Sequence, residues 1–330
     1  MIKVKLYTRK DCHLCDEAKG HLDALQESIP HQLEIIDIDN NRKLRKQYGE
    51  LIPVIEVGPY QLKAPIDRKE LEVTLSAARI GIEQDEAIDE AVFQSGAKGQ
   101  ITWTIADSFT SWLSRHYLAL INLFVFVYLS IPFFAPVLMN IGMTQPAYII
   151  YRVYSTVCHQ LAYRSWFLFG EQYAYPKEDA GVDRLMSYEE ATGMDSSDLL
   201  AARRYIGDTN VGYKVALCER DVAIYLSILL FGLIFAITGR KLAPFPAILW
   251  VLLGLVPIAL DGFSQLLSQP PFSLIPYRES TPFLRTLTGF LFGFTSAWFG
   301  IPMVESTMAD AKKFLEKKRA RYKASPAPGD

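Results

Sequence analysis

The distribution of apolar residues along the chain changes sharply near residue 117. Before this point, polar and apolar residues alternate or recur at short intervals, which is typical of a water-soluble domain. After it, long apolar stretches occupy residues 118–140, 222–238, 245–260 and 283–304. At about 1.5 Å per residue, each covers most or all of a hydrocarbon layer of about 30 Å. The pattern predicts an all-α polytopic membrane bundle with about four transmembrane helices.

Two features of the apolar stretches indicate how the predicted helices pack. The link between the second and third stretches is only a few residues long, so these helices are expected to form an antiparallel hairpin. Gly289 and Gly293 have the spacing at which small residues let two membrane helices approach closely. A further apolar stretch, 148–170, contains His159 and two arginines, which are costly in hydrocarbon. We expect that stretch to be interfacial or re-entrant rather than spanning.

The first 80 residues show shorter periods. Alternation predicts β-strands, and an apolar spacing of three to four residues predicts helices. The predicted strands are 3–7, 33–38 and 51–57, and the predicted helices are 16–27 and 68–79. This order of elements predicts a small α/β domain over residues 1–80.

Three further regions complete the predicted organisation. Residues 81–117 are first acidic and then contain tryptophans, which indicates a linker followed by an interfacial helix. The membrane domain, 118–305, is interrupted by a hydrophilic insert at 171–217, which we interpret as a cap or spacer with two short helices, one starting near 188 and one at 199–205. Residues 306–330 are predicted to be a basic tail.

Composition and charge exclude one class of partner. Of the 330 residues, 50% are hydrophobic and only 21% are charged, and the formal net charge is -2. Without an excess of basic residues there is no broad positive field to hold nucleic acid, which is therefore excluded as a partner. The long apolar stretches make membrane lipid the expected partner instead.

Basic residues near the ends of the predicted spans indicate their orientation. Arg240 and Lys241 lie between the second and third spans, and a cluster of lysines and arginines at 312–321 follows the fourth. Short segments rich in Lys and Arg stay on the cytoplasmic side of a membrane. With an even number of spans and no export signal at the start, we expect an integral protein of a bacterial plasma membrane. Its N-terminal domain and C-terminal tail would both be cytoplasmic.

The clearest chemistry is carried by Cys12 and Cys15, which stand between the first predicted strand and the first predicted helix. At a helix N-terminus, free amide N–H groups and the helix dipole stabilise a thiolate, the attacking species in disulfide exchange. Cys15 lies one turn further along the same face, where it can resolve a mixed disulfide made by Cys12. A Cys-x-x-Cys pair is also half of many zinc sites. No second ligand pair at zinc-site spacing follows nearby, which favours the redox interpretation.

Two segments carry a family resemblance. Residues 7–18, with the sequence YTRKDCHLCDEA, and the Ile-Pro-Val at 52–54 resemble the glutaredoxin-like branch of the thioredoxin superfamily. The resemblance implies a thioredoxin-like fold, with Cys12 as the nucleophile, Cys15 as the resolving thiol and Pro53 as a cis-proline that faces them. From the residues alone, a proline at a strand entry is also compatible with an ordinary edge strand.

The resemblance also bears on substrates and electron donors. Candidate donors are glutathione and thioredoxin, and the candidate substrate is a disulfide in a protein or a small molecule. Glutaredoxins usually carry Pro and Tyr between the two cysteines, whereas this chain carries His13 and Leu14.

A second group of polar residues lies close to the apolar stretches. Ionisable residues near membrane spans usually pair with one another or line a cavity, so they are functional candidates by default. The residues singled out are Cys158, His159, Gln160, Arg164, Cys218, Arg220, Asp221, Asp261, Gln265, Arg278 and Arg285.

Three interpretations are open for Cys158 and Cys218. The two thiols can form a disulfide in an oxidising compartment, or they can bind zinc or copper together with His159 and Asp221. The third interpretation is a polar packing cluster without chemistry.

Several of these residues belong to motifs that resemble a bacterial family of predicted membrane proteins of unknown function. The motifs are Cys158-His159-Gln160, Arg164-Ser165, Cys218-Glu219-Arg220, Asp261-Gly262 with Gln265, Arg278-Glu279-Ser280-Thr281, Leu284-Arg285 and Thr288-Gly289. The resemblance covers most of residues 145–304 and implies no activity. Some members of that family have a cysteine where this chain has Asp221.

These patterns support three hypotheses about function. The first is a membrane-anchored thiol-disulfide oxidoreductase that uses the Cys12 and Cys15 dithiol. The second is a membrane transporter or metal-binding membrane protein, with a site at Cys158, His159, Cys218 and Asp221 and with the glutaredoxin-like domain as a redox regulator. The third is a structural anchor whose polar membrane residues carry no chemistry.

Overall fold

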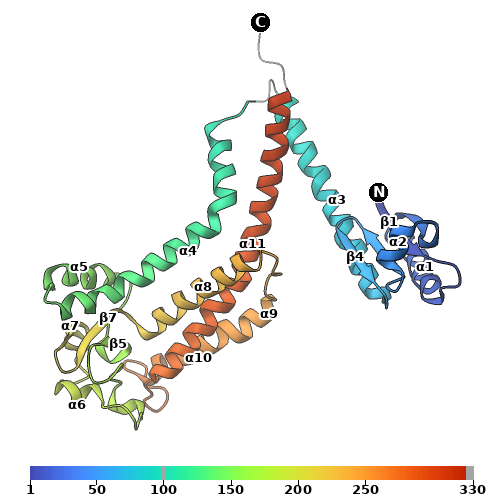
Figure 1. The fold of residues 1–330 in the computed structure, drawn as a ribbon. Helices are drawn as coiled ribbons and strands as arrows, with labels where there is room; N and C mark the ends of the chain where they lie inside the picture. The colour runs from blue at the N-terminus through green and yellow to red at the C-terminus, as the bar shows by residue number, and fades with distance from the viewer. Residues whose placement is uncertain (98–101, 325–330) are drawn as a thin grey trace, which may run out of the picture. The chain divides into compact units, whose positions relative to one another are not determined.

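The computed structural model of the chain describes residues 1–97 and 102–324. The chain divides into two compact units, one made of Met1–Ile105 with Lys313–Asp330 and the other of Ala106–Lys312. Residues 98–101 of the expected linker and 325–330 of the expected tail lie outside the described residues. Figure 1 shows the elements of both units.

The first unit contains a four-stranded sheet in the order β2-β1-β3-β4. The strands are β1 (Ile2–Thr8), β2 (His31–Asp37), β3 (Val54–Val57) and β4 (Tyr60–Lys63). Strand β1 is parallel to β2 and antiparallel to β3, and β3 and β4 form an antiparallel hairpin. Along β1, Ile2, Val4 and Leu6 are buried while the lysines between them are exposed. This is the alternation of side chains that a half-buried strand requires.

Two helices cover one face of this sheet. In α1 (His13–Leu25) and α3 (Arg68–Ala97), Leu22 and Leu71 are fully buried and pack with the apolar side chains of β1 and β3. A second buried cluster is formed by alternate strand positions, including Tyr7, together with α2 (Arg42–Tyr48) and η1 (Ile38–Asn40). The predicted α/β fold is confirmed, although α2 and β4 were not predicted.

Helix α3 is much longer than the sequence pattern indicated. It continues to Ala97, so residues 81–97, expected to start a linker, extend this helix. Within the same unit, Lys313 Nζ lies 3.5 Å from Asp85, and Lys317 Nζ lies 3.0 Å from Asp89. The acidic residues of the expected linker therefore pair with basic residues of the expected tail, and that part of the tail is helical.

The second unit is built on spanning helices. Among the described residues, four helices are long and apolar enough to cross a membrane. They are α4 (Ile105–Asn140), α8 (Glu219–Ile237), the continuous helix of α9 (Ala247–Trp250), η4 (Val251–Leu255) and α10 (Val256–Ser268), and α11 (Pro282–Ala324). Large side chains such as Phe124, Leu252 and Phe263 are exposed on them, as expected for surfaces that face lipid rather than water. The prediction of four spans is confirmed, and the helix expected before the first span is the first part of α4.

Glycines set the closest approaches between these helices. A Cβ atom added at Gly293 of α11 would lie 2.3 Å from the carbonyl oxygen of Ile224 in α8, and one at Gly289 would lie 2.7 Å from that of Arg220. A Cβ atom added at Gly232 of α8 would meet the side-chain amide of Asn122 in α4. Helix α8 is therefore held between α4 and α11, and the glycine spacing in the sequence correctly indicated one of these contacts.

A cap formed by residues 144–217 lies between α4 and α8 in the chain. It contains the helices α5 (Thr144–Tyr154), η2 (Ala162–Arg164), η3 (Glu178–Ala180), α6 (Tyr188–Thr192) and α7 (Leu199–Arg204). The two short helices expected in the hydrophilic insert are α6 and α7, and Ser187 with Glu190 forms a capping box before α6. The stretch 148–170 is not a spanning helix, because α5 ends at Tyr154 and a strand begins at Ser165.

The cap also holds a sheet that the sequence pattern did not indicate. Strands β5 (Ser165–Leu168), β7 (Gly212–Cys218) and β6 (Gly207–Asp208) lie in the order β5-β7-β6. The central residues of β7, Val215 to Leu217, are fully buried against Tyr151 and Tyr154 of α5. The spans form the expected helical bundle, and the cap adds to it a small sheet that was not predicted.

Candidate functional site

Cys12 and Cys15 form a disulfide at the start of α1. Cys12 is the N-cap residue and is partly exposed, whereas Cys15 in the first turn is buried at 2% exposure. The amides of Cys15 and Asp16 donate to the Cys12 carbonyl oxygen at 3.0 and 3.2 Å, which closes the first turn of the helix. When the pair is reduced, the helix N-terminus favours the thiolate form of Cys12. The exposed sulfur can be attacked or can attack, and the buried one cannot easily be reached from outside.

The segment that contains Pro53 packs beside this disulfide. Ile52 and Val54 belong to the same buried cluster as Cys12 and Cys15, and the Ile52–Pro53 peptide bond is cis. Tyr7, in the same cluster, donates a hydrogen bond of 2.8 Å from its hydroxyl to Glu56 Oε2. Burial and this hydrogen bond raise the pKa of Tyr7 to about 12, so its hydroxyl stays neutral near the thiols at physiological pH.

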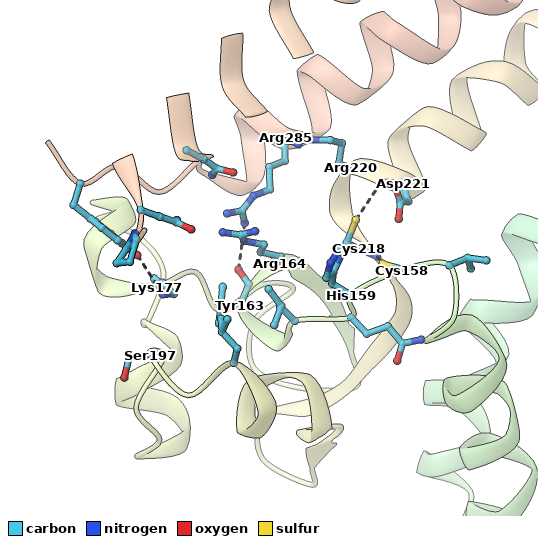
Figure 2. A pocket seen from close by; sticks show the side chains of 18 residues that line it. Cys158, His159, Tyr163, Arg164, Lys177, Ser197, Cys218, Arg220, Asp221 and Arg285 are labelled. Atoms are coloured by element: carbon cyan, nitrogen blue, oxygen red, sulfur yellow. Dashed lines mark hydrogen bonds between the residues drawn. The ribbon is translucent and has the colours of Figure 1, made fainter. Parts of the chain in front are cut away.

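A pocket of about 890 Å³ lies in the second unit, between the cap and the spans (Figure 2). Its lining combines thiols, arginines and amides with tyrosine and aliphatic side chains. Of the residues singled out from the sequence, those that line it are Cys158, His159, Gln160, Arg164, Cys218, Arg220, Asp221, Gln265 and Arg285. Asp261 and Arg278 do not line the pocket. The structure thus gathers residues from segments that are far apart in the chain.

Gln160 fixes the loop that carries Cys158. Its side-chain amide donates to the carbonyl oxygens of Tyr151 at 3.0 Å and Ala216 at 2.9 Å, and it is only 3% exposed. The backbone of Gln160 has a positive φ of 52°, which turns the chain sharply after His159. Gln160 therefore ties the loop to both α5 and β7.

Lys214 supports the same loop from inside the cap. Its ammonium group donates to the carbonyl oxygens of Gln160 and Arg203, each at 2.7 Å, and the residue is fully buried. Burial lowers the pKa of Lys214 to about 7. The strand β7 therefore carries a lysine whose charge is costly, and whose place is set by two backbone acceptors.

Cys158 and Cys218 are both free thiols. The amide of Cys218 donates to Cys158 Sγ at 3.3 Å, and Cys218 Sγ, as the N-cap of α8, accepts from the amide of Asp221 at 3.5 Å. A hydrogen bond from the Cys218 thiol to the Cys158 sulfur lowers the pKa of Cys158, and this side-chain bond together with burial raises the pKa of Cys218. The disulfide interpretation of this pair is not what the structure shows. His159 is exposed and does not join the two sulfurs.

Asp261 in α10 is the centre of one ion-pair cluster. It accepts from Arg220 at 2.5 Å, from Arg278 at 2.9 Å and from the Ser280 hydroxyl at 3.0 Å, and it is 4% exposed. Arg220 lies in α8 and Arg278 lies after α10, so this carboxylate joins two spans to the segment that leads into a third. Asp261 therefore holds Arg220, which lines the pocket, and Arg278 binds the same carboxylate.

Glu279 is the centre of a second cluster. Arg164 of the cap binds it with two hydrogen bonds of 2.9 Å, in a bidentate geometry that Arg and carboxylate groups favour. Arg285 of α11 also pairs with Glu279, and it pairs with Glu219 at 3.4 Å. The Gln269 amide donates to Glu279 at 3.1 Å. This cluster connects the cap to α8, α10 and α11.

Comparison with known proteins agrees with the division into two parts. Residues 3–80 match the family described as "Glutaredoxin-like domain (DUF836)". Together with the sheet order and the cysteine pair at the start of α1, this match decides the nature of the first unit. Residues 3–80 form a glutaredoxin-like domain. Residues 209–299 match the family described as "Predicted membrane protein (DUF2085)", and this match with the four apolar helices indicates a membrane protein.

Two further proteins are similar to parts of the chain. An uncharacterized protein of Methanocaldococcus jannaschii is 29% identical over 198 residues, which is 58% of this chain and 94% of that protein. The X-ray structure of a structural-genomics target protein from X. campestris is 33% identical and covers 22% of this chain and 96% of its own, with a TM-score of 0.20.

Some residues that shape the pocket were not selected from the sequence. Glu219 and Glu279 stood in the sequence motifs, but only their burial at 1% and 6% reveals them as the counter-ions of Arg285 and Arg164. Lys177 donates to the Tyr277 hydroxyl at 3.2 Å and lies 4.7 Å from the ring centre of Tyr163. Within the glutaredoxin-like domain, by contrast, no comparable set of buried ion pairs occurs among the described residues.

Proposed function

We propose that the protein is a membrane-anchored thiol-disulfide oxidoreductase whose reactive group is the dithiol of Cys12 and Cys15. The observation that carries the proposal is the asymmetry of this pair: Cys12 is partly exposed at the N-terminus of α1, and Cys15 is buried one turn below it. The glutaredoxin-like domain supplies the scaffold. The four apolar helices supply the anchor.

The asymmetry assigns the order of the two exchange steps. The Cys12 thiolate attacks one sulfur of a substrate disulfide, so that a bond forms between Cys12 and that sulfur and the other sulfur leaves as a thiolate. The Cys15 thiolate then attacks Cys12 Sγ and releases the first substrate sulfur. Two electrons pass to the substrate, and the protein is left with the Cys12–Cys15 disulfide seen in the structure. Two donor thiols, from two glutathione molecules or from the dithiol of one thioredoxin, then reduce this disulfide back to the dithiol and are themselves left as a disulfide.

The arrangement of charges at one end of the spans supports a cytoplasmic location for the glutaredoxin-like domain. Arg240, after α8, lies 3.5 Å from Glu305 of α11 and donates to the carbonyl oxygen of Arg115 in α4 at 3.1 Å. The start of α4, the link after α8 and the later part of α11 therefore meet at one end of the bundle. Positive residues at this end favour the cytoplasmic side. The chain segments that lead to the domain and to the tail both leave from this end.

The test uses the full-length protein in detergent with a fluorogenic disulfide peptide as substrate. The wild type should reduce it with glutathione or thioredoxin as donor, and the faster donor identifies the physiological class. The Cys15→Ser variant should accumulate a mixed disulfide at Cys12 that mass spectrometry detects, because the resolving thiol is missing. An undiminished rate in Cys12→Ser would overturn the proposal.

Orientation is tested separately in sealed vesicles. A membrane-impermeant maleimide, applied to reduced right-side-out vesicles, should label Cys12 only after the vesicles are opened. Labelling of Cys12 in intact vesicles would place the glutaredoxin-like domain on the outer side.

A further inference from the structure

Three potential metal ligands meet on one wall of the pocket in the second unit. Cys158 Sγ, Cys218 Sγ and a carboxylate oxygen of Asp221 all lie within 4.8 Å of one another. All three line the pocket, and Figure 2 shows their side chains close to one another. They come from the loop after α5, from the end of β7 and from the first turn of α8. Small movements of side chains alone could bring three such atoms onto one ion of about 2.0–2.3 Å bond length.

The carboxylate of Asp221 differs from every other buried or half-buried carboxylate around this pocket. Glu219, Glu279 and Asp261 each have an arginine partner. Within residues 1–97 and 102–324, no hydrogen bond or ion pair reaches the Asp221 carboxylate, which stands beside two thiols instead. Three groups that carry negative charge when ionised repel one another, and a bound cation removes that repulsion.

The surroundings of the two sulfurs suit metal-bound thiolates. Cys158 Sγ accepts a backbone N–H from Cys218, and Cys218 Sγ accepts one from Asp221. Such hydrogen bonds fix the direction of a sulfur ligand and stabilise its charge. Gln160, anchored to α5 and β7, holds the loop of Cys158 in place. Backbone groups therefore hold the two sulfurs in position before any ion binds.

From these observations, we propose that Cys158, Cys218 and Asp221 bind one divalent cation of the zinc class, with the fourth coordination position open to the pocket. Two thiolates exclude magnesium and calcium, which take oxygen ligands, and the carboxylate favours zinc over copper(I). Binding releases the thiol protons, so that two thiols and Zn²⁺ give a dithiolate complex and two protons. An open fourth position is the arrangement found where zinc contacts a small molecule. The pocket provides the space for that molecule.

This site is independent of the proposed exchange reaction at Cys12 and Cys15. The experiment therefore uses the full-length Cys12→Ser/Cys15→Ser variant, in which the only other thiol pair of the chain is absent. The protein is purified in detergent, reduced, stripped with a chelator and titrated with Co²⁺. One Co²⁺ per chain should bind and give sulfur-to-cobalt charge-transfer absorption with the visible bands of a four-coordinate ion. Added Zn²⁺ should abolish these bands and raise the melting temperature.

Single substitutions in the same background identify the ligands. Cys158→Ser should lose the charge-transfer absorption, and Asp221→Asn should weaken binding by more than the about 10–100-fold that loss of a group outside the ligand set costs. Asp221→Asn preserves shape, so its melting temperature without metal should match that of the parent, which separates lost binding from unfolding. Asp183→Asn, an exposed carboxylate of the cap, and His159→Ala should bind as the parent does.

Three results would overturn the proposal. The first is a folded, reduced parent that shows neither the cobalt spectrum nor stabilisation by Zn²⁺. The second is a Cys158–Cys218 disulfide in the purified protein. The third is loss of binding in His159→Ala, which would mean that the fourth position is closed by a protein ligand.

Discussion

The two thiol pairs of this chain are assembled in different ways. Cys12 and Cys15 are 3 positions apart in the sequence and lie in one helical turn, where they form a disulfide. Cys158 and Cys218 are 60 positions apart, and they meet only because a loop and the end of a strand are brought together. The first pair has a buried apolar cluster around it, and the second has a carboxylate beside it.

This difference separates what each pair can do. Two sulfurs in one turn can close and open a disulfide without rearranging the fold, because a single helical turn keeps both sulfurs within reach of each other. Two sulfurs on separate segments, with a carboxylate near both, are better suited to share a cation than to exchange electrons. Under the two proposals made above, the chain combines a redox pair made by local structure with a binding site made by tertiary structure.

The largest effect that tests this division is on disulfide reduction. Cys12→Ser should lower the rate by on the order of 10³-fold or more, because the attacking thiolate is gone. The double variant Cys158→Ser/Cys218→Ser should keep the wild-type rate within about twofold, since neither thiol takes part in the exchange. The rates are measured on full-length protein with the fluorogenic peptide. A large loss in the double variant would show that both pairs act in one electron path.

The ion-pair clusters behind the pocket should matter for the second unit alone. Asp261→Asn leaves Arg220 and Arg278 without their shared counter-ion, and breaking such a buried pair costs about 3–5 kcal/mol. The thermal unfolding of the membrane part in detergent should move down markedly, while that of the glutaredoxin-like domain stays unchanged. Asp183→Asn, which removes an exposed charge, is the matched control. Equal melting temperatures for the two variants would contradict the role given to Asp261.

Glycines allow close contact between two of the spans. A methyl group at Gly293 would overlap the backbone of Ile224, whereas one at Gly300 of the same helix would meet nothing within 4 Å. Gly293→Ala should therefore destabilise the bundle by about 1–3 kcal/mol. Gly300→Ala should be neutral or slightly stabilising, because alanine favours a helix. Both are measured by thermal denaturation in detergent, and similar values for the two would refute the tight α8–α11 contact.

The smallest predicted effect is a pH dependence of the cap. Lys214 has a pKa of about 7 in the folded protein because it is buried, whereas an unfolded chain binds this proton up to about pH 10.4. Between these values the unfolded state holds more protons, so the free energy of unfolding should rise with pH by about 1 kcal/mol per unit.

This slope is measured by melting temperatures at pH 7, 8 and 9. It is determined in the Cys158→Ser/Cys218→Ser background, so that the neighbouring thiols do not titrate, with Arg203 as the remaining nearby charge. Lys214→Met should flatten the slope, since the group that releases the proton is absent. The same slope in both proteins would mean that Lys214 stays charged when buried.

The elements that could be predicted from sequence are those whose signal is local. The alternation of Ile2, Val4 and Leu6 indicated β1, the long apolar runs indicated the spans, and the spacing of Gly289 and Gly293 indicated a close contact. In each case the residues that make the signal also make the structure.

The rest depends on partners that are distant in the chain. Strand β5 is four residues long and pairs with β7, whose residues lie about 50 positions later, so neither segment shows a strong period of its own. A lysine within the short apolar run of β7, Lys214, was a signal that this strand lies against buried hydrogen-bond acceptors. His159 follows Cys158 directly, which suggested a shared site, but Cys158 is buried whereas His159 is exposed and does not join the group. Arg164 and Glu279 are 115 positions apart, so the sequence around neither residue indicates that the two form a pair.

The pairing of α3 with the last part of α11 also affects the order in which the chain can mature. Asp85 and Asp89 are synthesised early, whereas Lys313 and Lys317 emerge only after all the spans have been made. The sheet of the glutaredoxin-like domain can fold as soon as it leaves the ribosome. The salt bridges of Asp85 and Asp89 in α3 can form only later, after Lys313 and Lys317 have been synthesised.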